Sequence, residues 1–161
     1  MSVIQNRAAF SKHLQSFLPE KKKEMTDRIE RIAFFIHERA LARTPVHTGE
    51  AVANYQWSLD TPFVGTIEPI NSPASPGRTN DLPLGAEPRR RANEGMANAS
   101  FHEIDWSKTF GRVVYLSNNS EQWAGLEAGQ LPESPLRQRS PMGMIGVALS
   151  ELEARMQAGA I

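Results

Sequence analysis

The feature that most constrains the fold is a long amphipathic helix that ends at a proline. Between Glu20 and Arg43, apolar residues recur with the 3.6-residue period of one helix face. These residues are Met25, Ile29, Ile32, Ala33, Ile36 and Ala40. The helix ends at Thr44-Pro45, because a proline disfavours helical geometry in the residue before it. At about 1.5 Å per residue it would be roughly 35 Å long, enough to span a small domain.

Two phenylalanines widen the apolar face of this helix, and a second apolar segment precedes it. Phe34 and Phe35 lie beside the main stripe, so the helix could be covered on two sides. From Asn6 to Leu18 a shorter pattern with helical spacing predicts another helix. Pro19 follows this segment and predicts either a break or the first turn of a new helix.

A tight turn follows the long helix and leads into a predicted strand. Thr44 or Thr48 can form hydrogen bonds around the turn, and Gly49 can adopt a positive φ. Polar and apolar residues alternate from 52 to 59, which predicts a half-buried strand with Trp57 in the core. Residues 63–67 are predicted to form the returning strand.

The C-terminal half of the chain predicts three helices and one strand. The helical patterns cover residues 89–104, 122–128 and 142–156, and the strand covers residues 111–117. Gly129 is expected to end the short second helix. Trp123 lies in that short helix and could either pack in the core or form the edge of an interface.

A proline-rich segment separates the two halves. Its prolines are Pro69, Pro73, Pro76, Pro83 and Pro88. Prolines at this spacing exclude regular elements, so we predict an extended loop or arm over residues 69–91. Residues 131–141 predict a second loop. The expected fold class is therefore α+β, a single domain of residues 1–161 in which a long N-terminal helix and a C-terminal helix pack on a small antiparallel sheet.

The composition limits the partners and the compartment. Lys+Arg and Asp+Glu number 18 each, so the chain has no net charge that would attract it to nucleic acid or to an anionic membrane. The chain has no cysteine, which excludes a disulfide scaffold and suits a reducing compartment. No apolar run approaches the roughly 20 residues that span a bilayer, and the N-terminus lacks a signal-peptide pattern. We expect a protein used in the cytosol, or in a particle assembled there, with no membrane partner.

Nothing in the sequence has the pattern of a catalytic or metal site. The histidines are interpreted as surface or turn residues, because none has a metal-ligand spacing. They are His13, His37, His47 and His102. A glycine-rich phosphate loop and a Gly-x-Ser-x-Gly elbow are both absent from the sequence. We therefore expect no enzyme activity, no cofactor and no bound metal.

One cluster of basic residues is a candidate interface. Arg89, Arg90 and Arg91 are consecutive, and Arg78 precedes them in the proline-rich segment. They could contact DNA phosphates or an acidic neighbouring subunit, or lie in solvent at the start of a helix. Phosphate binding has less support than a protein contact, because aromatic residues are not interleaved with these arginines.

Two separated groups of motifs resemble those of a known family. The first group is Thr44-Pro45-Val46-His47-Thr48-Gly49, followed by Trp57. The second group is Val-Val-Tyr-Leu-Ser-Asn at 113–118, Trp123-Ala124, Leu126-Glu127-Ala128-Gly129 and Pro141-Met142-Gly143-Met144. In this order the motifs resemble the tail-completion and neck (head–tail joining) proteins of long-tailed bacteriophages, the group that includes minor tail protein Z. The chain departs from the family at His47, where an aspartate is usual, and at Trp123, where a tyrosine is usual.

The resemblance implies a structural role rather than catalysis. The chain would be a subunit of a ring in a virion, at the head–tail junction or the tail end, and the ring could have six copies. Its partners would be other copies of itself and neighbouring neck or tail-tube proteins, with non-specific contact to DNA as an option. The alternative is a nucleic-acid-binding module that uses Arg89–Arg91.

Four motif positions in the second group are candidate structural residues. Glu127 falls near the C-terminal end of a short helix, where the helix dipole disfavours a carboxylate. We therefore expect it to have a cationic or amide partner, within the fold or across a subunit boundary. Pro141 fits the first turn of the closing helix. Gly129 and Gly143 are the remaining two positions of the motif.

Overall fold

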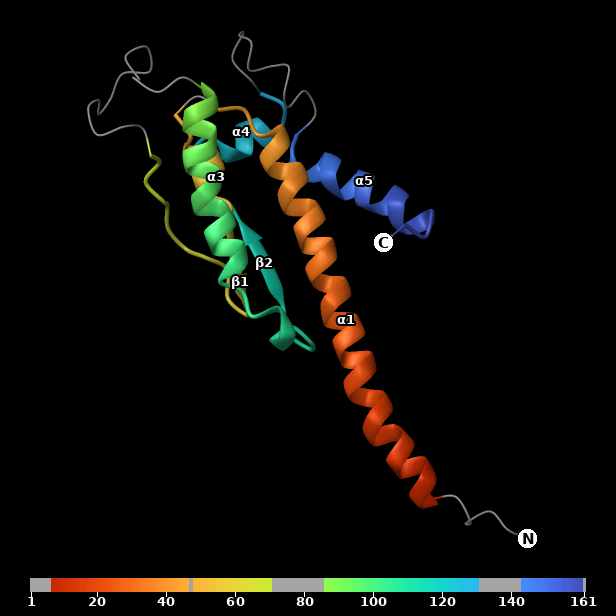
Figure 1. Cartoon of the computed structure of the whole chain (residues 1–161). Coiled ribbons are helices and arrows are strands. Elements are labelled where there is room, and N and C mark those ends of the chain that lie inside the picture. Colours follow the sequence, from red (N-terminus) through yellow and green to blue (C-terminus); the bar gives the residue numbers. More distant parts are fainter. Residues whose placement is uncertain (1–6, 47, 71–85, 131–142, 161) are drawn as a thin grey trace.

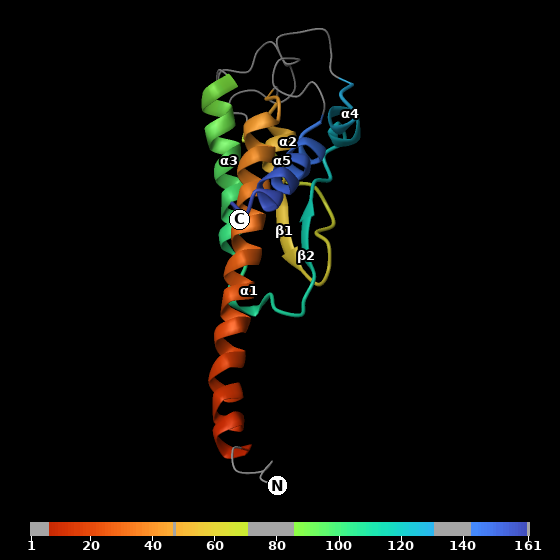
Figure 2. The same ribbon diagram turned by 90° about the vertical axis from the view of Figure 1, so that its right-hand side faces the viewer.

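The computed structural model of the chain describes residues 7–46, 48–70, 86–130 and 143–160. The elements, in order, are α1 (Arg7–Arg43), α2 (Glu50–Ala53), β1 (Gln56–Leu59), α3 (Ala86–His102), the 3-10 helix η1 (Trp106–Lys108), β2 (Val114–Ser117), α4 (Trp123–Glu127) and α5 (Ile145–Gln157). The two strands form an antiparallel sheet, and α1 and α3 lie side by side over one of its faces (Figures 1 and 2). This confirms the predicted α+β fold with a long N-terminal and a C-terminal helix.

Helix α1 is one continuous helix of 37 residues, roughly 55 Å long. Both alternatives predicted at Pro19, a break and the first turn of a new helix, are wrong, because Pro19 lies inside the helix. A proline there removes the hydrogen bond to the Gln15 carbonyl. Gln15 is exposed, so water can bind the carbonyl group that the proline leaves without a donor. The missing bond therefore leaves no buried polar group unsatisfied.

The first part of α1 projects beyond the rest of the molecule (Figures 1 and 2). Every side chain from Phe10 to Met25 is exposed, and Thr26 is buried, the first such residue among the described side chains of the helix. We call residues 7–25 the projecting half of α1. The second half of the helix packs against η1 and α5 and carries the buried Ala33, Ala40 and Leu41.

The sheet pairs two strands that are distant in the sequence. The register matches Gln56 with Ser117 and Leu59 with Val114. The predicted hairpin is therefore wrong in two respects. Residues 50–53 form helix α2 rather than the start of a strand, and residues 63–67 have no regular structure. Residues 51–53 of α2 are all buried. The alternation of polar and apolar residues that predicted a strand therefore does not correspond to alternating burial in this segment.

Two asparagine side chains hold the irregular segment that follows β1. Asn54 bonds the backbone of Ile67 in both directions, at 2.9 Å to its carbonyl and 2.7 Å from its N–H. Asn93 does the same for Ile70, at 3.1 and 2.8 Å. An amide side chain can replace a strand partner in this way, because it offers both donors and an acceptor. Residues 60–70 are thus fixed to the body without a third strand.

The core consists of adjoining clusters around α1 and the sheet. One cluster surrounds the fully buried Tyr55 and joins α1, α2 and α3. A second cluster contains Trp57, Phe101 and Trp106 and packs on Ala33 of α1. Trp57 is buried, as the sequence predicted.

Helix α3 begins at Ala86, so the predicted arm of residues 69–91 is too long at its C-terminal end. Residues 71–85 of that segment lie outside the described residues.

Candidate functional site: the motif cluster and two exposed surfaces

The two groups of motifs meet at the end of the body where α1 stops. The Thr44 hydroxyl donates to the Ala40 carbonyl at 2.7 Å, and its oxygen lies 2.8 Å from the Tyr55 hydroxyl. The same Tyr55 oxygen lies 3.8 Å from Met144 Sδ, which belongs to the second group. Burial raises the pKa of the Tyr55 hydroxyl far above its usual range, so it stays neutral. This contact is structural, and we call these residues with Glu127 and Gly143 the motif cluster.

Gly49 has the conformation that the sequence predicted. Its φ is 91°, and it precedes the first turn of α2. A Cβ at this position would lie 2.3 Å from Asn93 Nδ2, closer than any real contact. The Glu50 N–H lies 3.3 Å from the Thr48 hydroxyl, which accepts its hydrogen bond. Pro45 is buried beside this turn, and His47 lies outside the described residues.

Glu127 has amide partners within the fold, which is one of the alternatives that the sequence left open. Its carboxylate accepts hydrogen bonds from the N–H groups of Met144, Ile145 and Gly146, at 2.9, 3.1 and 2.8 Å. These are the free N–H groups at the start of α5, so the carboxylate at the end of α4 caps the next helix. The gain at the N-terminus of α5 offsets the unfavourable position at the end of α4.

The glycines beside Glu127 allow this close approach. Gly143 has a φ of 89°, and a Cβ there would lie 2.6 Å from the Glu127 carbonyl oxygen. Gly129 has a φ of 73° and ends α4, as predicted. Helix α5 begins at Ile145 rather than at residue 142. Pro141 lies outside the described residues.

The candidate arginine cluster does not form one surface. Arg90 is 5% exposed, and its guanidinium donates to the Leu41 carbonyl at 2.6 Å, to the Thr44 carbonyl and to Glu94 at 3.0 Å. It therefore caps the C-terminal end of α1 from inside the fold. Arg89 is also buried, whereas Arg91 is exposed, because consecutive helical residues point in different directions. Arg78 lies outside the described residues.

His37 is buried, which contradicts its interpretation as a surface residue. Its Nδ1 accepts a hydrogen bond from Trp57 Nε1 at 3.0 Å, and its Nε2 lies 2.8 Å from Asn98 Oδ1, to which it donates. These partners match a neutral imidazole. Burial lowers the pKa of His37, and the Asn98 hydrogen bond opposes this only in part. His13 and His102 are exposed, as predicted.

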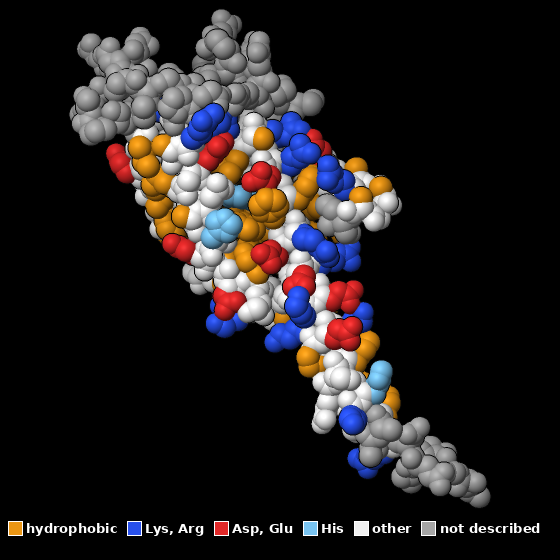
Figure 3. Space-filling view, in the orientation of Figure 1, with side chains coloured by type: hydrophobic (Ala, Val, Ile, Leu, Met, Phe, Trp, Pro, Cys, Tyr) orange, Lys and Arg blue, Asp and Glu red, His pale blue; other side chains and the backbone are white. Residues whose placement is uncertain are grey.

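The projecting half of α1 is the first of two exposed surfaces. It carries large apolar side chains that are exposed on the surface (Figure 3). They are Phe10, Leu14, Phe17, Leu18 and Met25. Phe10 and Leu18 are each 61% exposed. Phe10, Leu14 and Phe17 follow the alternating four- and three-residue spacing that places side chains on one seam of a helix.

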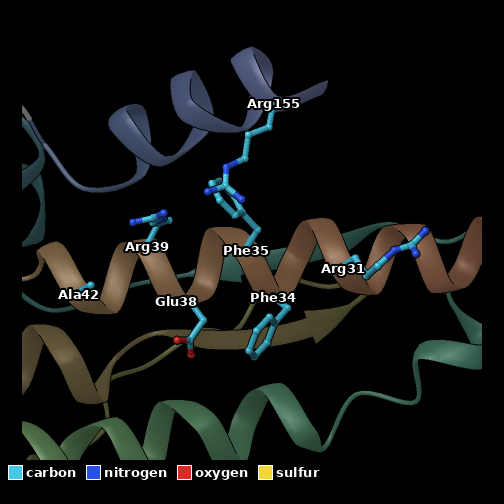
Figure 4. A pocket seen from close by; sticks show the side chains of 7 residues that line it. All are labelled: Arg31, Phe34, Phe35, Glu38, Arg39, Ala42 and Arg155. Carbon is cyan, nitrogen blue, oxygen red and sulfur yellow. The ribbon is translucent and has the colours of Figure 1, made fainter. Parts of the chain in front are cut away.

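The second exposed surface is a groove between α1 and α5, which we call the arginine groove. Its volume is about 460 Å³, and it is lined by Arg31, Phe34, Phe35, Glu38, Arg39, Ala42 and Arg155 (Figure 4). The two helices are held together beside it by Glu151, which pairs with Arg43 and, at 3.4 Å, with Arg39.

Trp123 is half-buried and packs edge-on against Tyr55, with 5.2 Å between the ring centres.

Sequence reasoning could not locate the arginine groove or the role of Arg90. The adjacent pair Phe34 and Phe35 indicated a second covered face on the long helix, but not which element approaches it. Phe34 remains 49% exposed. Nothing in the local pattern distinguished Arg90 from its two neighbours, because the carbonyl groups that it caps lie more than forty positions earlier.

The part of the chain that the structure describes contains no group of three acidic or histidine residues that could hold a metal ion. None of the helices in it is long and apolar enough to cross a membrane. Searches against protein-family models, curated proteins and solved structures found no match.

Proposed function

We propose that this protein is a structural, non-catalytic subunit of a ring at the head–tail junction or tail end of a long-tailed bacteriophage. The proposal starts from the resemblance of the two motif groups to tail-completion and neck proteins. Its structural support is that both groups converge on the motif cluster, where Thr44, Tyr55 and Glu127 make packing and capping contacts. Residues with such contacts preserve a shape rather than perform a reaction.

The observation that carries the proposal is the projecting half of α1. Its 19 residues extend roughly 28 Å and bury none of their own described side chains. Most helical stability in proteins comes from packing an apolar face, and a helix in water gains little of it. The exposed seam of Phe10, Leu14 and Phe17 therefore fits a helix that packs against a neighbouring copy. If this contact joins copies head to tail, it closes into a ring where the rotation between neighbouring copies permits closure.

The mass of the protein in solution tests the self-association. We expect the full chain to form oligomers at micromolar concentration, by light scattering after size-exclusion chromatography. The double substitution Phe10→Ser and Phe17→Ser should leave a folded monomer. The matched control is Gln15→Ser, which changes an exposed polar side chain on the same half. A wild-type chain that stays monomeric at high concentration, alone and with neighbouring virion proteins, contradicts the proposal.

The position in a virion needs a second experiment. Co-expression with tail-tube and connector proteins from the same genome should give rings at one end of the tube in negative-stain images. The double serine variant should not be incorporated. Salt-dependent binding of duplex DNA by the isolated protein would instead favour the nucleic-acid-binding alternative. That alternative is weakened because Arg90 is engaged within the fold.

A further inference from the structure

The arginine groove combines an apolar floor with a cationic rim. Phe34, Phe35 and Ala42 provide apolar surface from α1. Arg31 and Arg39 come from the same helix and Arg155 from α5, so two elements that are distant in the sequence converge on it (Figure 4). The lining residues include three arginines and only one carboxylate, that of Glu38.

The positive charge of the rim is only partly neutralised within the chain. Arg39 forms an ion pair with Glu151 at 3.4 Å. Among the described residues, neither Arg31 nor Arg155 forms an ion pair, and Arg155 lies over the Phe35 ring at 4.8 Å from its centre. Arg31 and Arg155 are both exposed, so they are available to a ligand.

We propose that the arginine groove binds an acidic amphipathic segment of a partner protein. Apolar side chains of that segment would cover Phe34 and Ala42, and its carboxylates would pair with Arg155 and Arg31. An uncharged apolar segment fits less well, because covering the arginines without an anion leaves desolvated charges unpaired. Guanidinium groups suit carboxylates, because they offer two parallel N–H donors to the two oxygens.

Charge and ring geometry favour this occupant over two others. The projecting half of a second copy carries Arg7, Lys12 and Lys21–Lys23 against Glu20 and Glu24, so the rim would repel it. Single-stranded nucleic acid gains much of its affinity from bases stacked on aromatic faces. Arg39 and Arg155 lie over the Phe35 ring, at 5.4 and 4.8 Å from its centre. A base would have to displace an arginine in order to stack on this ring. This inference does not depend on ring formation by the proposed function.

Two labelled peptides and the full chain test the proposal. The first is a helical peptide of about 15 residues with leucines at i, i+3 and i+7 and glutamates at the flanking positions. In the second, glutamines replace all the glutamates. Fluorescence anisotropy should show binding of the glutamate peptide that weakens as salt increases. The glutamine peptide should bind at least about tenfold more weakly, because the charge-assisted hydrogen bonds are lost.

Substitutions on the rim locate the binding. Arg31→Glu and Arg155→Glu should each weaken binding of the glutamate peptide by about tenfold or more. Both side chains are exposed, so the variants should fold, which circular dichroism checks. Lys108→Glu makes the same change of charge at an exposed residue outside the groove and should have little effect.

Three results would overturn the proposal. They are no measurable binding of the glutamate peptide, equal binding of both peptides, and binding that Arg31→Glu and Arg155→Glu leave unchanged. A labelled single-stranded oligonucleotide is the competing probe. If it binds more tightly than the glutamate peptide and loses affinity in the same two variants, the groove is a nucleic-acid site and not a peptide site.

Discussion

Glu127 is the residue through which α4 and α5 are joined. Its carboxylate accepts three N–H groups from the first residues of α5, and Gly143 provides the close approach that these bonds require. A helix N-terminus has free donors and a partial positive charge, so a carboxylate placed there by another element substitutes for an N-cap side chain. Helix α5 also forms one wall of the arginine groove. The position of Arg155 therefore depends on Glu127.

Glu127→Ala should lower the free energy of unfolding by about 1–2 kcal/mol, the usual cost of losing a helix cap. Urea denaturation with a helical signal measures this change. Glu153→Ala is the matched control, because it removes an exposed glutamate from α5 and should change stability by less than about 0.5 kcal/mol. Equal effects of the two substitutions would mean that the cap contributes nothing.

Gly49 and Gly95 offer a pair of glycines with opposite expected effects. Gly49→Ala places a Cβ against Asn93 in a backbone with positive φ, so it should cost about 1 kcal/mol or more. Gly95 lies within α3, and a Cβ added there would meet no heavy atom within 4 Å, so Gly95→Ala should stabilise the protein by about 0.5–1 kcal/mol. Thermal unfolding of both variants checks the signs. A stabilising Gly49→Ala would contradict the described turn.

His37 should make the stability depend on pH. Burial lowers its pKa in the folded state, so the unfolded chain binds more protons near neutral pH. The free energy of unfolding should therefore fall as the pH decreases below the unfolded value of about 6.5. His37→Phe should be less stable overall, because it loses two hydrogen bonds, but its stability should change less between pH 7 and pH 5. Chemical denaturation at several pH values tests this, and parallel curves for both proteins would exclude His37 as the cause.

At the scale of elements, local sequence patterns predicted the helices and the strand that depend on local interactions. The helix at 89–104, the strand at 111–117 and the short helix at 122–128 correspond to α3, β2 and α4. Apolar periodicity and a glycine stop were sufficient signals for the two helices, and β-branched and aromatic content was sufficient for the strand. The partner of β1 was not predictable in the same way, because strand pairing depends on contacts far apart in the sequence.

The features of the candidate site show the same division between those that local sequence signals predict and those that depend on long-range packing. The positive φ of Gly49 followed from the turn, and the need of Glu127 for a cationic or amide partner followed from the helix dipole, and both signals are local. The burial of His37 and Arg90 follows from the packing of α3 against α1, and the arginine groove from the packing of α5. These contacts join elements that no local signal connects.

The two halves of α1 should differ in their protection from solvent exchange. In the monomeric Phe10→Ser, Phe17→Ser variant, amides of residues 7–24 should exchange faster than those of residues 30–43, because only the second half is packed. Pro19 removes one further hydrogen bond from the first half. Hydrogen exchange followed by mass spectrometry measures both regions. Uniform protection along α1 would show that the projecting half has a partner within its own chain.

At the scale of the whole molecule, the body and the projecting half of α1 are separable. The three core clusters use residues from Ile29 onward, so no described residue of the projecting half belongs to them, although Lys22 lies over the Phe110 ring at 5.7 Å from its centre. The projecting half therefore contributes apolar surface without contributing to the core. In the ring that we propose, a subunit of this shape would keep its own stability independent of assembly, and its projecting half would gain stability from a neighbouring copy.

A chain without residues 1–21 should therefore fold with nearly the stability of the full chain, as a monomer. We expect its melting temperature to stay within about 3 °C of the monomeric full-length Phe10→Ser, Phe17→Ser variant, since a change of 1 kcal/mol would produce about that shift. A chain without residues 1–32 loses Thr26 and Ile29, which pack on the body, and should melt at a clearly lower temperature. If the shorter deletion alone unfolds the protein, the projecting half stabilises the body, and its exposed seam is not reserved for a neighbouring copy.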